Sequence, residues 1–292
     1  MISAIAPAKI NLTFLGGRRS TEKYNEVASI YQALDFFEEV AVTPASNWAV
    51  EVHSDAVQEQ SRVPQDTTNI VVKAAIELAA SAGIEQVQTM KFVITKQVPP
   101  AGGMAGGSAD AAAALVALNQ AWGLKLSTNE LLEVAARVGA DVPFAVLGGT
   151  ALGTDSGIEL ATLKSFSESH VLLIFSTPGL STATVFQEFD RLTPGGDMQM
   201  SASELASQYA ADPAPLVGLN SLQQAAFALR SDLEALSKLV PGKKAFVSGS
   251  GPTLFMISQD LGDIHSWQEV YAQAGFKTLV TKTSSRGAEL IS

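Results

Sequence analysis

The chain of 292 residues has no cysteine, and its three histidines, His53, His170 and His265, lie far apart in the sequence. Disulfide bonds, thiolate metal sites and cysteine nucleophiles are therefore excluded. The histidines do not have the spacing of metal ligands, so we interpret each as an ordinary surface or core residue.

Basic residues are few: 19 Lys and Arg stand against 29 Asp and Glu, for a formal net charge of −10. An acidic surface repels nucleic acids and acidic membranes. Long apolar runs are also lacking, because Lys9 interrupts the N-terminal one and the alanine-rich run at 111–118 is too short to span a bilayer. We expect a cytoplasmic protein, a monomer or weak homodimer, with no nucleic-acid and no membrane partner.

The two best-known phosphate-binding motifs are missing, yet a glycine-rich segment is present. No Gly-x-x-x-x-Gly-Lys-Ser/Thr motif occurs, and Gly103-Met104-Ala105 breaks the Gly-x-Gly start of the dinucleotide fingerprint. Residues 99–110 nevertheless hold four glycines within six residues before an alanine-rich run. We expect Ser108 to cap a helix there, with Asp110 in its first turn. Free backbone amides at a helix start favour a phosphate site; the alternative is a structural turn.

Three further segments contain residues suited to chemistry. Lys9 lies among apolar residues of an expected strand, where it is either a surface lysine or a buried cation that needs a carboxylate or phosphate partner. Asp141 precedes Pro143, which is typical of a helix cap but also allows a carboxylate that faces a hydroxyl. Residues 246–253 form either a tight hairpin or a second set of amides for a phosphate.

Apolar periodicity predicts the elements and an α+β fold in two parts, 1–156 and 157–292. In the first part we expect a hairpin at 40–53, helices at 69–82, 109–122 and 128–138, and a strand at 89–96. Ser127 and Glu130 form a capping box for the helix at 128–138. In the second part the expected strands are 170–175, 244–248, 253–258 and 276–282, and the expected helices are 182–191, 203–210, 220–239 and 263–274. Apart from the extra helices, their β-α-β-β-α-β order is typical of a ferredoxin-like unit.

The Pro-Ala-Lys-Ile-Asn-Leu segment at 7–12, the glycine loop and Ser248-Gly249-Ser250-Gly251, in this order, resemble the three motifs of the GHMP kinases. The resemblance covers nearly the whole chain. It implies a two-domain GHMP kinase architecture: an N-terminal domain like domain 2 of ribosomal protein S5, a ferredoxin-like C-terminal domain, and a site between them.

Within this superfamily the segments 101–110, 139–144, 148–154 and 220–223 resemble one branch. Its members phosphorylate the erythritol 2-hydroxyl of a cytidine-diphosphate-linked methylerythritol, in the non-mevalonate route to isoprenoid precursors. The resemblance implies ATP and Mg²⁺ as cofactors and this small cytidine diphosphate compound as substrate.

The resemblance also implies roles for individual residues. Lys9 and Asp141 match the catalytic pair, and Lys96 matches a lysine at the nucleotide rim. The residues that match the ATP loop are Pro99, Pro100, Ala101, Gly102, Gly103, Met104, Ala105, Gly106, Gly107, Ser108 and Ala109. Those that match the acceptor and cytosine site are Asn11, Tyr24, Asn25, Thr182 and Phe186. No metal ligand is assigned.

The chain departs from the family pattern in two places. The chain has Glu22-Lys23-Tyr24-Asn25 where the family usually has Asp-Gly-Tyr-His, although an amide also donates and accepts hydrogen bonds. Ala109 stands where many members have a second serine. Two alternatives therefore remain: another GHMP kinase, acting on mevalonate or homoserine, and a catalytically silent nucleotide-binding homologue.

Overall fold

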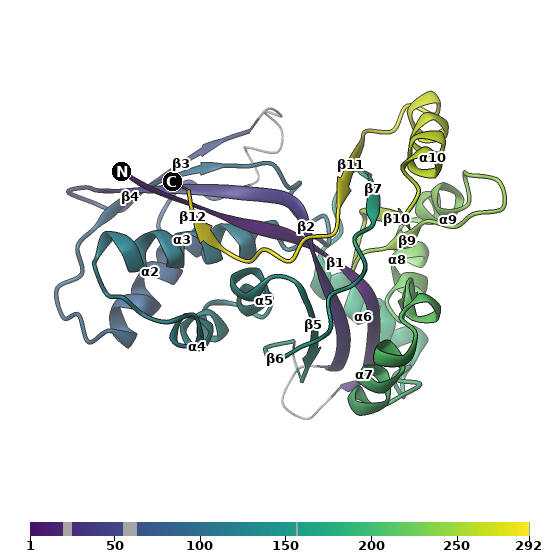
Figure 1. The fold of residues 1–292 in the computed structure, drawn as a ribbon, viewed down its shortest axis with the longest axis horizontal. Coiled ribbons are helices and arrows are strands. Elements are labelled where there is room, and N and C mark those ends of the chain that lie inside the picture. The colour runs from purple at the N-terminus through teal and green to yellow at the C-terminus, as the bar shows by residue number, and fades with distance from the viewer. Residues whose placement is uncertain (20–24, 55–62, 156, 292) are drawn as a thin grey trace.

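The computed structural model describes residues 1–19, 25–54, 63–155 and 157–291. Figure 1 shows two parts, a large sheet with helices packed on it and a smaller sheet with its own helices. Within the described ranges no helix is long and apolar enough to cross a membrane.

The larger sheet is built on a long antiparallel pair, β1 (Ile2–Arg19) and β2 (Asn25–Pro44). The main strand order is β12-β1-β2-β4-β3. In addition, β5 pairs with β2, β6 pairs with β5, and β8 pairs with β1. The bounds of the other strands are β3 Ala49–His53, β4 Met90–Thr95, β5 Thr150–Thr154, β6 Glu159–Thr162, β8 Leu219–Asn220 and β12 Glu289–Leu290. The β1–β2 register shifts between Pro7 and Lys9 and again between Asn11 and Thr13. Because such irregularities change the direction of side chains, they affect the segment that carries Lys9 and Asn11.

Helices α2 (Ile70–Ser81), α3 (Gly106–Ala121), α4 (Thr128–Val138) and α5 (Val142–Leu147) pack with this sheet. Helix α3 is buried through a run of alanines, whose small side chains allow close contact with β1 and β2. The capping box of Ser127 and Glu130 begins α4 as predicted.

The smaller sheet has the order β11-β7-β10-β9, the arrangement of a ferredoxin-like unit, and confirms that prediction. Its strands are β7 His170–Ile174, β9 Phe246–Val247, β10 Leu254–Ser258 and β11 Thr278–Lys282. The helices of this half are α6 Thr182–Leu192, α7 Ala202–Ala211, α8 Gln223–Leu229, α9 Ser231–Ser237 and α10 Leu261–Gln273, with a short 3₁₀ turn at Ala214–Leu216. Leu172 and Ile174 pack with Trp267 and Tyr271 of α10 in the core.

Four local expectations were wrong. The hairpin at 40–53 does not form, because β4 lies between β2 and β3 and pairs in parallel with β3. Helix α3 begins at Gly106 after Ala105, so Ser108 lies inside the first turn and is not the cap, and Asp110 lies beyond the first turn. The long helix expected at 220–239 is interrupted at Arg230, which separates α8 from α9.

Chain segments on both sides of residue 156 build the larger sheet. β6 pairs with β5, and both β8 and β12 pair with β1 on the edge opposite β2, β8 in parallel at Thr13 and Phe14 and β12 antiparallel at Ala4 and Ile5. The two parts of the molecule are thus joined by strands as well as by packing.

Candidate active site

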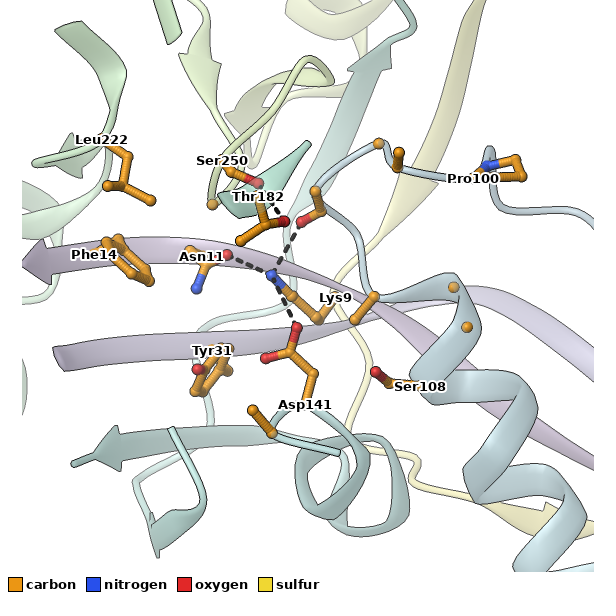
Figure 2. Close-up of a pocket in the computed structure, with 18 of the residues that line it drawn as sticks. Lys9, Asn11, Phe14, Tyr31, Pro100, Ser108, Asp141, Thr182, Leu222 and Ser250 are labelled. Atoms are coloured by element: carbon orange, nitrogen blue, oxygen red, sulfur yellow. Dashed lines mark hydrogen bonds and ion pairs between the residues drawn. The ribbon is translucent and has the colours of Figure 1, made fainter. Parts of the chain in front are cut away.

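A cavity of about 380 Å³ lies where the two parts meet. Figure 2 shows side chains from β1, β2, the start of α3, the residue before α5 and the start of α6 around it. Among the residues that the structure describes, the charged side chains of its lining are Lys9 and Asp141.

Lys9 is buried in β1 and its ammonium has three partners. The Nζ atom donates to Asn11 Oδ1 at 2.7 Å and to Gly103 O at 3.0 Å, and it lies 3.9 Å from Asp141 Oδ2. Burial lowers the pKa of Lys9, and the charge of Asp141 partly offsets this effect. The interpretation of Lys9 as a buried cation with a carboxylate partner is confirmed.

Asp141 occupies the cap position of α5, and Pro143 lies in the first turn as expected. Its carboxylate makes no capping hydrogen bond to the helix. The side chain, about one third exposed (32%), is directed at Lys9 in Figure 2. The backbone carbonyl of Asp141 accepts from Ala145 N at 3.1 Å and so begins α5, while the side chain lines the cavity.

Asn11 is held by a chain of hydrogen bonds inside the β1–β2 pair. Its Nδ2 donates to Ser29 Oγ at 2.7 Å, and Ser29 Oγ donates to Thr13 O at 2.7 Å. With Oδ1 accepting from Lys9, the amide has one fixed orientation next to the ammonium.

The glycine loop forms one wall of the cavity. From the predicted set, the lining includes Pro99, Pro100, Ala101, Gly102, Gly103, Ala105, Gly106, Gly107 and Ser108. Gly103 has φ +80°, and a Cβ atom there would lie 2.2 Å from Ser248 O, so the loop touches the 248–251 turn at a position that only glycine fits. The start of α3 is part of the same wall, which provides the positive end of a helix for an anion.

The ferredoxin-like part supplies the opposite wall. Thr182 Oγ1 of α6 lies 3.1 Å from Ser250 Oγ in the turn between β9 and β10. Asn220 steadies this turn by donating to Val247 O at 2.8 Å and to Gly249 O at 2.9 Å. Phe186 packs edge-on against Phe14, with ring centroids 6.1 Å apart.

Some predicted site residues do not line the cavity. Met104 and Ala109 are fully buried in the two cores on either side of the loop. Lys96 lies below the loop with Glu38 and Asp110. Asn25 donates to Asp190 Oδ1 of α6 at 2.8 Å. The roles given to these residues stay predictions, and Tyr24 lies outside the described residues.

Sequence reasoning missed Tyr31 and Phe14. Tyr31 lies opposite Asn11 in the β1–β2 ladder, and Lys9 Nζ is 5.6 Å from the centroid of its ring. Burial, followed by the charge of Asp141, raises the pKa of Tyr31 well above its usual value. No local pattern marks either aromatic residue, because strand register and the β1 irregularities decide which side chains reach the cavity.

The arrangement suits an anion and a hydroxyl group better than a resident metal. Among the described residues no group of three His, Cys, Asp or Glu side chains could hold an ion. A buried ammonium, free backbone amides and one carboxylate are instead what a phosphate next to an alcohol requires.

Comparison with known proteins assigns the family. Residues 69–149 match the GHMP kinases N terminal domain. A 4-diphosphocytidyl-2-C-methyl-D-erythritol kinase of Nocardia farcinica is 44% identical over 257 residues, 85% of this chain and 82% of the relative. A protein of the same name from Nocardioides sp. is 37% identical over 295 residues, covering 98% of this chain and 99% of the relative.

Solved structures support the fold. A crystal structure of 4-(cytidine 5'-diphospho)-2C-methyl-D-erythritol kinase superposes with a TM-score of 0.74 at 22% identity, covering 97% of this chain and 99% of that one. The homoserine kinase of Cytophaga hutchinsonii reaches 0.68 at 18% identity, covering 99% of this chain and 97% of that one. From the sequence relatives, supported by this shared fold, we conclude that the chain belongs to the 4-diphosphocytidyl-2-C-methyl-D-erythritol kinase family of GHMP kinases.

Proposed function

We propose that this kinase transfers the γ-phosphoryl group of ATP to the erythritol 2-hydroxyl of 4-diphosphocytidyl-2-C-methyl-D-erythritol. The observation that carries the proposal is the Lys9–Asp141 pair, 3.9 Å apart, in the same cavity as the glycine loop and the start of α3. The names and extents of the sequence relatives support the choice of acceptor.

The phosphate end of the site is the glycine loop. Backbone amides of the loop and of the first turn of α3 bind the ATP phosphates, and Lys9 offsets the charge on the γ-phosphoryl group. Because Lys9 already donates to Asn11 and Gly103, its ammonium is held in place before any ligand enters.

The acceptor end of the site is Asp141. Its carboxylate accepts a hydrogen bond from the 2-hydroxyl and aligns the oxygen with the γ-phosphorus. The new bond forms between these two atoms, the bond from the γ-phosphorus to the β–γ bridging oxygen breaks, and the hydroxyl proton passes to the Asp141 carboxylate or to water. Held 3.9 Å from the Lys9 ammonium, the carboxylate has orientation of the hydroxyl as its main task.

Mg²⁺ fits this site as a companion of ATP. Asp141 is the one carboxylate of the described lining, so phosphate oxygens and water would supply most of the ligands. When bound, the ion neutralises charge on the phosphates.

The cytidine end of the substrate binds next to α6 in this proposal. Phe186 and Phe14 offer an apolar surface to the base, and Thr182 and Ser250 offer hydroxyls to the diphosphate. The net charge of −10 favours such a small substrate over a nucleic acid. We retain the expectation of a cytoplasmic monomer or weak homodimer.

The deciding experiment is an ADP-release assay of the purified chain with ATP and Mg²⁺. The acceptors tested in parallel are 4-diphosphocytidyl-2-C-methyl-D-erythritol, mevalonate and homoserine. We expect turnover with the cytidine compound alone. Turnover with mevalonate or homoserine would assign another GHMP activity. ATP binding without turnover of any acceptor would identify a silent homologue.

A further inference from the structure

A buried ion cluster lies directly beneath the glycine loop. Lys96 Nζ is 2.8 Å from Glu38 Oε1 and 2.6 Å from Asp110 Oδ2, and no side chain of the three is more than 3% exposed. Removing three charged groups from water is costly, and apolar replacements of such clusters are often no less stable. Stability alone is therefore a weak explanation for this one.

The cluster joins the two ends of the loop. Glu38, on β2, accepts from the backbone N–H of Gln97 at 2.9 Å and of Val98 at 3.1 Å, just before the loop begins. Asp110 belongs to α3, which follows the loop. Lys96 connects these two carboxylates, so the entry and the exit of the loop are tied to the same ammonium.

The cluster also touches the loop's exit from behind. A Cβ atom on Gly106, the first residue of α3, would lie 3.0 Å from Glu38 Oε1 and 3.1 Å from Lys96 Nζ. Gly106 itself lines the active-site cavity. A single glycine backbone thus separates the buried charges from the place where phosphates bind.

The loop needs such support. Ala101 and Ala105 have φ values of +56° and +58°, a left-handed conformation that is unfavourable for a residue with a side chain. Contacts outside the loop have to offset that cost. The hydrogen bonds that Glu38 accepts from Gln97 and Val98 act before the loop, and the one that Lys96 donates to Asp110 acts after it.

Lys96 has little charge to offer a ligand in the cavity. It does not line the cavity, and two carboxylates already surround its ammonium. Lys96 instead lines a separate pocket, whose lining also includes His53 and Lys277. Burial and the charge of Asp110 raise the pKa of Glu38 to about 7, an effect that Lys96 partly offsets.

We propose that Lys96, Glu38 and Asp110 are positioning residues, which hold the glycine loop and the first turn of α3 in the geometry that binds the ATP phosphates. This inference rests on the proposed function for the identity of the ligand. According to this proposal the cluster affects the binding of the ATP phosphates and does not affect the binding of the acceptor substrate.

The test compares Glu38→Gln with the unchanged protein. The new amide keeps the shape of Glu38, but its NH₂ group must face either a backbone N–H or the ammonium, so at least one hydrogen bond is lost. The affinities for ATP and for inorganic tripolyphosphate are measured by displacement of a fluorescent ATP analogue. Glu77→Gln, which alters an ion pair with Arg137 between α2 and α4, is the matched control.

We expect Glu38→Gln to weaken the binding of ATP and of tripolyphosphate by the same factor. The factor is about tenfold if the binding free energy falls by roughly 1.4 kcal/mol. The KM for ATP should rise, the KM for the acceptor should stay within about twofold, and Glu77→Gln should bind as the unchanged protein does.

Two results would overturn the proposal. Unchanged affinity for both ligands would leave the cluster without a role in binding. Weaker binding of ATP together with unchanged binding of tripolyphosphate would show that the cluster affects the binding of the nucleoside and not of the phosphates. If Glu38→Gln does not fold, the same two affinities are measured for Asp110→Asn, and the same outcomes support or overturn the proposal. An unchanged protein that binds neither ligand would instead contradict the proposed function.

Discussion

At the scale of single residues, the contact between Lys9 and Asp141 is a loose one. The two charged atoms are 3.9 Å apart, whereas Lys9 makes its short hydrogen bonds to the neutral oxygens of Asn11 and Gly103. The carboxylate of Asp141 is therefore not held in a short ion pair, which fits its proposed hydrogen bond to a substrate hydroxyl.

Asp141→Asn should lower kcat by about 10²–10⁴, the range of a lost acid–base or orienting group. ATP affinity should change by less than about threefold, since we propose that the phosphates bind to the loop and to Lys9. Steady-state kinetics together with nucleotide titration measure both values. Asp263→Asn, on the far helix α10, controls for the loss of one carboxylate. Full activity of Asp141→Asn would remove this residue from the mechanism.

At the scale of elements, the loop and the turn between β9 and β10 form one unit. Gly103 O accepts hydrogen bonds from Lys9 Nζ and from Ser248 Oγ, both at 3.0 Å. Thr253 N donates to Gly102 O at 3.2 Å. The glycine loop is thus positioned by the Ser248 side chain and the Thr253 backbone of the other half of the molecule as well as by its own glycines.

Gly103→Ala should disturb both sides of this contact. Its Cβ would lie 2.2 Å from Ser248 O and 2.9 Å from Gly251 N, at a φ of +80°. We expect a loss of about 1–3 kcal/mol in the free energy of unfolding, measured by urea denaturation, and weaker ATP binding. Gly195→Ala, where a Cβ meets nothing within 4 Å, is the control. Equal stability of the two variants would mean that the contact is easily displaced.

Elements that depend on neighbouring residues were well predicted. The capping box at Ser127 begins α4, and the helix expected at 69–82 is α2, with Asn69 capping it through Val71 N–H. The start of α3 was misplaced because Ala105, without a capping side chain, precedes it in a left-handed conformation. That conformation depends on the packing of the loop, which local residue preferences do not contain.

At the scale of the whole molecule, the C-terminal segment returns to the first sheet. After β11 the chain pairs β12 with β1, and Ile291 N donates to Ser3 O at 2.9 Å. Ala288 N donates to Val146 O at 3.1 Å, at the end of α5. The segment therefore ties the ferredoxin-like part to the helix that Asp141 begins.

Deletion of residues 285–292 should lower the free energy of unfolding by about 1–3 kcal/mol, since at least two backbone hydrogen bonds are lost. It should also raise the KM of the acceptor, because α5 loses its support. Thermal unfolding and steady-state kinetics measure the two effects. The full-length variant Arg286→Ala separates the loss of that side chain's ion pairs from the loss of strand pairing. Unchanged stability of the truncated chain would show that β12 contributes nothing.

The sequence by itself determined most helices and strands, the glycine loop and, through family resemblance, the pairing of Lys9 with Asp141. These features depend on periodicity, caps and motifs, which are properties of residues close together in the chain. Only the tertiary structure decided that β4 separates β2 from β3, that Tyr31 reaches the cavity, and that Lys96 is enclosed by Glu38 and Asp110. These outcomes depend on strand register and on packing between distant segments, and register is set by how the sheets bury their faces as a whole.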